Sequence, residues 1–412
     1  MIFSRQKPTP RIHDKSRRVG IDLTSTRIRT VVSGSGPDRP ILLDAPDIDL
    51  SLVVNLDRKP LDVGRVGYAA IRKAPHHVCA NFLPYVTESK SWKAGRQSLS
   101  ADAALGVAFA KIAPGIVNEA EAIGLAIPAY LTPPQAMACA GTAAANKLPI
   151  AGTVVASLAV VAERADAILK GDPHAEETDD RPGIVPIRFG PGGPGSAVVI
   201  EVDDHALSAS VVWVDRGEAR LLLTAAWPKL SLRAWKDCLI DSISDRCVRL
   251  CRRDPRDSAD AEQSLFEQLD AAMEQATTNR PAAFHLRAAH WYQDLVQQPS
   301  EFDAVCLPFV NRVITGLTEL IYSSGVPAPP RAIWTTFAAS KLPGLATAIY
   351  ENSAESTTVA TLSADAVAAA AARLAPRWLT GELPRTHLDA IIPIALATPA
   401  LTARETVSAR RG

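Results

Sequence analysis

The 412-residue sequence has no excess of charge of either sign, because 44 lysines and arginines balance 44 aspartates and glutamates. Proteins that bind nucleic acids or anionic membranes depend on a basic surface. We therefore expect neither nucleic acid nor a membrane as a partner. Apolar residues make up 47% of the chain and charged residues 21%, which is typical of a globular protein with a substantial core.

Cysteine is scarce, with six scattered residues. That number is too low for a disulfide scaffold and is typical of a protein in the reducing cytoplasm. Cys247 and Cys251 lie one helical turn apart, but two ligands do not complete a tetrahedral metal site and no histidine lies near them in the sequence. We interpret them as packing residues.

Long apolar runs are also missing, since no stretch reaches the ~18 consecutive apolar residues that span a membrane. The first 18 residues are basic and polar and lack the apolar core of a secretory signal. We expect residues 1–18 to form a disordered basic tail and the protein to be cytoplasmic.

What the sequence does contain is an alternation of strand and helix patterns in two halves that each begin with strands. Strands are expected within 19–56 and at 122–127, 197–202, 208–214, 220–224 and 333–336, and a further apolar segment covers 150–162. Helices are expected within 64–114 and at 133–147, 231–278, 308–323 and 366–374, the third of these with a break at Asp254-Pro255. This alternation predicts an α/β protein with two related lobes.

The two halves are joined by a stretch, residues 170–195, that is first acidic and then rich in glycine and proline. Its Gly190–Gly195 segment resembles a phosphate loop in composition. Two prolines remove amide donors and a strand follows, whereas a phosphate cradle needs free amides at the start of a helix. We interpret it as a surface turn.

The most informative segment is Val19–Thr26, in which an apolar strand ends in Asp22 and hydroxylated residues follow. A β-hairpin of this composition can present backbone amides and the hydroxyls of Thr24, Ser25 and Thr26 to a phosphate. An acid at the end of the strand can hold a hydrated Mg²⁺. Asp22 is therefore a candidate metal ligand.

Segments in a fixed order along the chain resemble the nucleotide-binding domain of the 70-kDa heat-shock chaperone family, part of the actin-like ATPase (ribonuclease H-like) fold. The resemblance covers about residues 19–377. The segments that carry it are Gly20–Leu23, Ile127–Tyr130 with Gln135, Ala197–Glu201, Leu239–Asp241, Ile333–Pro343 and Asp365–Ala368.

The resemblance implies lobe I over 19–185, lobe II with a returning C-terminal helix over 186–377, and a linker-like tail over 378–412. It also implies an interlobe cleft for ATP or ADP with Mg²⁺. The family's peptide-binding domain has no counterpart in the sequence, so we do not expect peptide clamping by the family's mechanism.

The phosphate-binding residues of the family are not retained. Thr24 replaces the glycine of the first hairpin. In the second hairpin, Glu201-Val202 stands where the family has Asp-Leu, and Asp203 and Asp204 fall where it has three glycines and a threonine. Glycine lets amides approach an anion, whereas a carboxylate 4 Å from a phosphate charge costs about 4 kcal/mol at an effective dielectric of about 20. Asp203-Asp204-His205 favours a tight turn over a new metal site.

The adenosine and catalytic positions also differ. Phe337-Ala338 replaces a glycine pair, and Phe337 is expected to fill or block the adenosine pocket, either from its wall or as a core residue. The family's catalytic lysine corresponds to Ile71, with Arg72 and Lys73 expected to point elsewhere. The position of the family's metal-side acid falls near Ala156-Ser157, where this sequence has no acid. On the helix that clamps the nucleotide in the family, the lysine position falls near Met273, and Asp270 could stand for the acid.

The sequence therefore predicts a degenerate nucleotide-binding domain that has lost hydrolysis and acts as a binding, scaffold or chaperone-modulating protein with protein partners. The alternative is an active ATPase in which Asp22 organises the metal and Ser25 and Thr26 bind phosphate. Glu201, Asp203 or Asp204 would then position water or a second metal. A small-molecule kinase of the same fold is a third reading, without an assigned catalytic aspartate.

Overall fold

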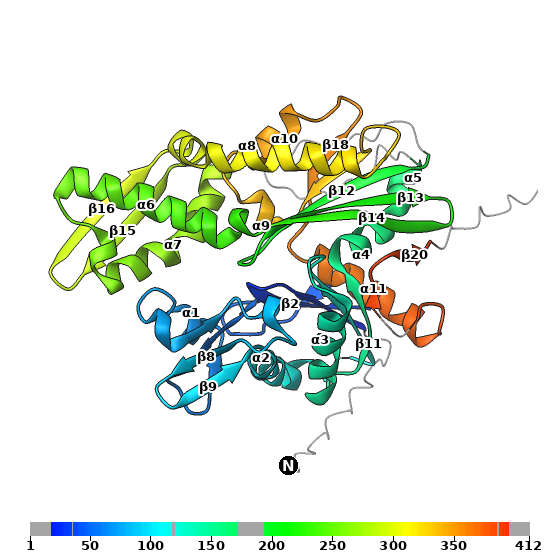
Figure 1. Cartoon of the computed structure of the whole chain (residues 1–412), viewed down its shortest axis with the longest axis horizontal. Helices are drawn as coiled ribbons and strands as arrows, with labels where there is room; N and C mark the ends of the chain where they lie inside the picture. The colour runs from blue at the N-terminus through cyan, green and yellow to red at the C-terminus, as the bar shows by residue number, and fades with distance from the viewer. Residues whose placement is uncertain (1–17, 35, 118–119, 171–192, 385–386, 395–412) are drawn as a thin grey trace, which may run out of the picture.

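The computed structural model describes residues 18–34, 36–117, 120–170, 193–384 and 387–394. The basic tail over 1–17, the acidic part of the junction and Gly190–Gly192, and residues 395–412 lie outside the described residues. The chain forms two sheet-containing halves, one above the other in Figure 1, with helices packed against both sheets. The α/β class predicted from the sequence is confirmed.

The first half contains a seven-stranded sheet in the order β19-β11-β10-β1-β2-β3, with β4 also paired to β2. Strand β1 runs antiparallel to β2 and parallel to β10. Its strands are β1 (Arg18–Leu23), β2 (Arg27–Ser33), β3 (Arg39–Pro40), β4 (Leu50–Ser51), β10 (Ala122–Ile127), β11 (Ile150–Val155) and β19 (His387–Leu388).

The second half contains a six-stranded sheet in the order β18-β17-β12-β13-β14-β20. Strands β12, β13 and β14 form an antiparallel meander, and β17 and β18 extend the sheet in parallel from β12. Its strands are β12 (Gly195–Val202), β13 (Leu207–Asp215), β14 (Glu218–Trp227), β17 (Ala332–Thr335), β18 (Thr358–Thr361) and β20 (Ile391–Pro393).

The two sheets repeat one arrangement. In each, an antiparallel meander (β1-β2-β3 or β12-β13-β14) continues from its first strand into two parallel strands (β10-β11 or β17-β18). The central strands are almost fully buried, as expected for sheets covered by helices on both faces. The repeat places the β1–β2 turn and the β12–β13 turn at equivalent positions in the two halves.

Helix α11 (Ala366–Leu379) joins the halves by returning to the first sheet (Figure 1). It lies on Gly20, Gly124 and Gly152, which are in register on β1, β10 and β11. A Cβ at Gly20 would lie 1.7 Å from the Ala368 carbonyl oxygen. The glycine of the predicted phosphate hairpin is therefore required for helix packing, whatever binds at the turn.

A single core connects the halves at α11 and α4 (Ala156–Glu163). Residues of both sheets, such as Val154 and Val199, belong to one buried cluster with Trp378 of α11. The remaining helices of the first half are α1 (Arg65–Tyr68), α2 (Ala101–Ile116) and α3 (Pro133–Ala145), whereas α5 (Ala165–Lys170) contacts β13 of the second half. The short strands of the first half are β5 (Val53–Asn55), β6 (Asp62–Val63), β7 (Val78–Ala80), β8 (Ser91–Ala94) and β9 (Gln97–Ser100).

The second half extends into a helical region with a two-stranded sheet, at the left of Figure 1. Serine caps begin its two long helices, with Ser231 Oγ accepting from Ala234 N and Ser258 Oγ from Ala261 N. The elements are α6 (Leu232–Cys251), α7 (Ala259–Thr277), β15 (Ala282–Ala288), β16 (Trp291–Gln297), α8 (Pro299–Ser323), α9 (Phe337–Ser340) and α10 (Leu345–Glu351). The predicted break at Asp254-Pro255 is confirmed.

The predicted start of the helix at Pro308 is wrong, because α8 begins at Pro299. The Gln298 amide donates to Glu301 Oε2 at 2.7 Å, which completes a capping box at the true start. Pro308 lies on the exposed side of the helix, where water can satisfy the carbonyl that a proline leaves free.

Four further features differ from the predictions. The helical and loop region predicted over 64–114 also contains β7, β8 and β9, and the hairpin β15–β16 was not assigned. Helix α11 continues through Pro376 to Leu379. Within the segment interpreted as a linker-like tail, β19 pairs with β11 and β20 with β14, so its described residues add a strand to each sheet.

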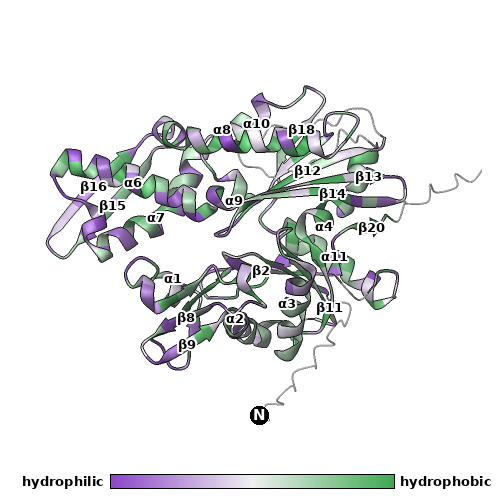
Figure 2. Cartoon of the chain, viewed as in Figure 1, coloured by the Kyte–Doolittle hydropathy of each residue, from purple (hydrophilic) through white to green (hydrophobic). Residues whose placement is uncertain are grey.

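Among the described residues, α8 is the one helix long and apolar enough to cross a membrane by length and composition. Its Phe302, Cys306 and Val313 are fully buried in the core of the second half. Figure 2 shows both hydrophilic and hydrophobic residues along it. We interpret α8 as an amphipathic core helix.

Candidate functional site

A cleft of about 980 Å³ lies between the halves, at the ends of β1, β2 and β12 and beside α1, α6, α7 and α9. Of the ten candidate residues from the sequence, eight line it: Asp22, Thr24, Thr26, Glu201, Asp204, Asp270, Phe337 and Ala338. The other two, Ser25 and Asp203, are buried in the contact between the two hairpin turns.

The β1–β2 turn and the β12–β13 turn are hydrogen-bonded directly to each other, an arrangement called the hairpin contact below. The Ser25 amide donates to Asp203 Oδ2 at 2.9 Å, and the Asp204 amide donates to Thr26 Oγ1 at 2.8 Å. The His205 amide donates to Ser25 Oγ at 3.0 Å. The Ser25 amide and the Ser25 and Thr26 hydroxyl oxygens, which were expected to face a phosphate, therefore have partners within the protein.

Asp203 is at the centre of the hairpin contact and is 3% exposed. Its Oδ1 accepts from the amides of His205 (2.9 Å) and Ala206 (3.1 Å) within its own turn. Its Oδ2 accepts from the Ser25 amide and, at 2.5 Å, from the Tyr130 hydroxyl. These bonds confirm the tight turn that was preferred over a metal site. The described residues contain no cluster of three or more side chains suited to hold a metal ion.

Tyr130 is a site residue that sequence reasoning did not single out, although it lies in the Ile127–Tyr130 segment. Its ring also lies 4.8 Å from the His205 ring, centroid to centroid. Burial and the neighbouring Asp203 carboxylate raise the pKa of its hydroxyl well above the usual value. Tyr130 therefore stays a hydrogen-bond donor and ties β10 of the first half to the second half.

Asp22 is 4% exposed and pairs with an arginine of the neighbouring strand. The Arg27 guanidinium lies 3.2 Å from Asp22 Oδ2 and 3.4 Å from Asp49 Oδ1, and Arg29 lies 2.8 Å from the same Asp49 oxygen. Burial raises the pKa of Asp22, and Arg27 opposes this rise. The positive charge beside Asp22 is thus supplied by the chain. Arg27 and Arg29 are two residues apart on β2 and so lie on one face of the strand, a spacing that could have indicated this positive charge from the sequence.

Glu201 and Asp204 are two carboxyl groups of the cleft whose pKa values are raised, which favours their neutral forms. Burial, together with Asp22 and Asp203, raises the pKa of Glu201 to about 8. Its Oε2 is buried and has no hydrogen-bond partner among the described residues. Burial raises the pKa of Asp204 to about 6, and Lys236 opposes this rise. Near pH 7, Glu201 is therefore mostly protonated, which lowers the repulsion among the three acids at the hairpin contact.

A second contact between the halves lies at the outer side of the cleft. The Tyr68 hydroxyl, at the end of α1, donates to Asp270 Oδ2 of α7 at 3.0 Å. Lys236 Nζ of α6 lies 2.8 Å from the Asp270 carboxylate and 3.3 Å from the Tyr68 hydroxyl. The Lys236 side chain is 4% exposed, so this is a buried ammonium that sequence reasoning missed.

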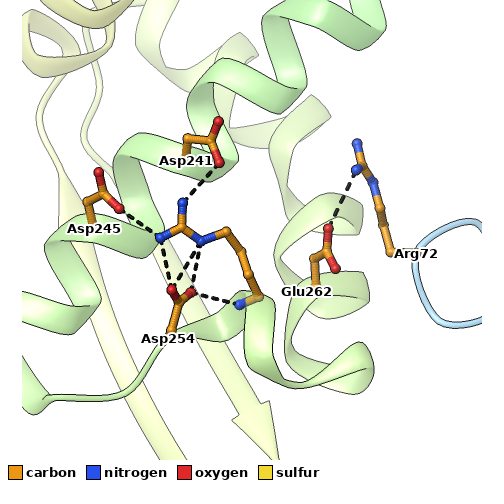
Figure 3. A network of polar contacts seen from close by, with 6 residues as sticks. Arg72, Asp241, Asp245, Asp254 and Glu262 are labelled. Atoms are coloured by element: carbon orange, nitrogen blue, oxygen red, sulfur yellow. Dashed lines mark hydrogen bonds and ion pairs between the residues drawn. The ribbon is translucent and has the colours of Figure 1, made fainter.

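Arg72 continues this outer contact away from the cleft. Its amide donates to Gln263 Oε1 at 2.8 Å, and its guanidinium pairs with Asp237. The guanidinium also lies 3.5 Å from Glu262 (Figure 3). Lys73 pairs with Asp260. Neither basic residue lines the cleft, in agreement with the prediction that they point elsewhere.

Beside Arg72, three aspartates converge between α6 and the start of α7 (Figure 3). Arg256 binds Asp241 at 3.0 Å, Asp245 at 2.8 Å and Asp254 at 2.9 Å. Asp241, part of a segment that carried the family resemblance, therefore lies in a surface ion-pair network. The network ties the connection between α6 and α7 to α6.

Phe337 lines one wall of the cleft. The residue is half-buried at the start of α9, and about 980 Å³ of cleft remains beside it. Lys341 Nζ lies 4.3 Å from the centroid of the Phe337 ring and 2.9 Å from Glu274 Oε2, which holds the ring along the wall. Ile71, at the family's lysine position, is buried in the core of the second half.

The sequence matches no protein-family model, and a search of curated proteins gives no match. The chemistry of the cleft therefore follows from its own geometry. Eight acidic and five basic side chains line it, which makes its surface acidic on balance.

Proposed function

We propose that this chain is an actin-like, heat-shock-chaperone-like nucleotide-binding domain that has lost ATP hydrolysis and works as a binding or scaffold protein. Its partners are proteins, and its compartment is the cytoplasm, in keeping with the six free cysteines. Hydrolysis requires hydrogen-bond donors that hold the phosphates and a carboxylate that holds a metal ion. In this cleft, backbone donors and the Asp22 carboxylate are already bound to other groups of the protein.

The repeated sheet arrangement supports the fold assignment. In both halves a meander continues into two parallel strands, the equivalent turns face each other, and α11 crosses back to the first sheet. The cleft opens between these halves, beside the two turns. This is the arrangement that the resemblance to a two-lobed ATPase implies.

The hairpin contact is the observation that carries the proposal. The amides of Ser25, Asp204 and His205 all donate across it to protein acceptors. Leaving a buried donor or acceptor unpaired costs about 1–3 kcal/mol, so a phosphate entering between the turns must first offset several such losses. It must also approach the Asp203 and Asp204 carboxyls.

The metal side of the cleft supports the same conclusion. Arg27 already neutralises Asp22, and Arg27 and Arg29 share Asp49. A divalent ion at Asp22 would have to displace a guanidinium that is 18% exposed. Close approach of the two cations is repulsive by several kcal/mol at an effective dielectric of about 20.

The size of the cleft favours a second candidate, an active ATPase with rearranged ligands. A volume of about 980 Å³ lies in the range of small-molecule sites, and Asp22, Thr24 and Thr26 line it. In that case Asp22 holds Mg²⁺ and Glu201 or Asp204 positions the attacking water.

Phosphate release from ATP and Mg²⁺ separates the two candidates. The first predicts that the unmodified chain releases phosphate no faster than a buffer blank, and that Asp22→Ala changes nothing. Turnover above the blank that Asp22→Ala abolishes would establish the second candidate and overturn the first. Asp215→Ala, at an exposed position at the far end of β13, is the matched control.

A further inference from the structure

One wall of the cleft already holds a buried cation. Lys236 Nζ lies 2.8 Å from the Asp270 carboxylate, 3.3 Å from the Tyr68 hydroxyl and 4.9 Å from the centroid of the Phe266 ring. A carboxylate and the negative face of an aromatic ring both stabilise an ammonium group that has lost its water. This wall therefore has the chemistry of a cation site.

Further carboxylates lie on the same wall without a cation of their own. Asp204 and Glu267 line the cleft, and among the described residues neither makes an ion pair. Glu267 accepts one hydrogen bond, from Gln263 Nε2 at 2.7 Å. Both line the cleft beside Tyr68 and, with burial and Asp270, contribute to raising the pKa of its hydroxyl. Glu201, deeper in the cleft, has a buried oxygen without a partner within the described chain.

The basic residues of the cleft, by contrast, are all paired with acids. The pairs are Arg27–Asp22, Arg29–Asp49, Arg65–Asp47, Lys236–Asp270 and Lys341–Glu274. An anionic ligand would have to break one of these pairs to reach a positive charge. A cationic ligand meets carboxylates that are already free to bind it.

We propose that the cleft binds a small organic cation of the polyamine type, with its amino groups at the Asp204 and Glu267 carboxylates and a hydrogen bond to the Glu201 oxygen that has no partner in the described part of the chain. The proposal rests on the proposed function, because the cleft must be free of ATP. Because Asp204 and Glu267 line the same cleft, a ligand with several amino groups on an aliphatic chain can pair with both. Tyr68 and Phe266 supply aromatic surface for its methylene groups.

Calorimetric titration of spermidine into the full chain at low ionic strength tests the proposal. We expect one-site binding that the double variant Asp204→Asn/Glu267→Gln weakens at least tenfold. The matched control is Glu88→Gln/Glu355→Gln, which removes the same charge from exposed positions outside the cleft. We expect the control to bind within about twofold of the unmodified chain.

Absence of spermidine binding up to millimolar concentration would overturn the proposal. Equal weakening of binding in both double variants would also overturn it, because that result indicates general charge attraction and not a site in the cleft. The melting temperature of each variant shows that it is folded. The single variant Glu267→Gln, at an exposed position on α7, replaces the double variant if that one unfolds. Phosphate release from ATP in the same preparation tests the proposed function separately, since spermidine binding can fail without turnover appearing.

Discussion

The Ser25 amide of the first half donates a 2.9 Å hydrogen bond to the Asp203 carboxylate of the second half, across 178 residues of sequence. Both residues are almost completely buried. The bond joins the two turns that the family resemblance assigns to phosphate binding. It fixes the distance between the halves at the point where a nucleotide's phosphates would otherwise be held.

Replacing Asp203 should destabilise the whole chain. Asp203→Ala leaves the amides of Ser25, His205 and Ala206 and the Tyr130 hydroxyl without their acceptor. We expect a loss of about 3 kcal/mol in the free energy of unfolding, measured by urea denaturation. The control Asp215→Ala should stay within about 0.5 kcal/mol, and an equally small loss for Asp203→Ala would contradict the role given to the hairpin contact.

Glu201 should make stability depend on pH in a specific direction. Its pKa is raised from 4.5 to about 8, so the folded chain binds a proton that the unfolded chain releases. This contribution is fully present below pH 4.5 and is lost as the pH rises toward 8, with a slope of at most ~1.4 kcal/mol per pH unit.

The variant Glu201→Gln removes the ionisable group and should flatten this part of the pH profile. Urea denaturation at pH 5 and pH 8.5 measures the effect. We expect the variant to gain stability relative to the unmodified chain at the higher pH. If the free energy of unfolding changed with pH in the same way for both proteins, Glu201 would ionise at its usual pKa in the folded chain, which would contradict the prediction.

Gly20 should not tolerate a side chain, although it lies next to the residues of the candidate site. The Cβ of Gly20→Ala would meet the backbone of α11, with the Ala368 oxygen at 1.7 Å. We expect a loss of about 2–4 kcal/mol in thermal or urea unfolding. Gly141→Ala, in α3 with nothing within 4 Å of the new Cβ, should be neutral or slightly stabilising. Equal tolerance of both changes would contradict the close packing of α11.

The sequence predicted those parts of the fold that have a local signal. The β1–β2 hairpin, the break before α7 and the Asp203-Asp204 turn follow from apolar periodicity and turn chemistry, and the structure confirms them. The start of α8 was missed because Pro308 suggested a boundary, whereas an exposed proline is tolerated inside a helix. The β15–β16 hairpin alternates buried Ala282, Phe284 and Leu286 with exposed residues, a period of two that was available in the sequence.

The site was less accessible from sequence because its main contacts are long-range. Nothing near Lys236 in the chain indicates that Tyr68 and Asp270 will enclose its ammonium group. Likewise, the absence of glycine at 203–206 predicted impaired phosphate binding but did not indicate that the two turns bind each other. Phe337 was correctly assigned to the cleft, but its orientation depends on Lys341 and Glu274.

The most direct test of the central claim is a calorimetric titration of ATP with Mg²⁺ into the unmodified chain. Because the amides of Ser25, Asp204 and His205 and the Asp22 carboxylate already have partners, we predict a dissociation constant weaker than about 1 mM. A micromolar dissociation constant, accompanied by phosphate release, would contradict the account.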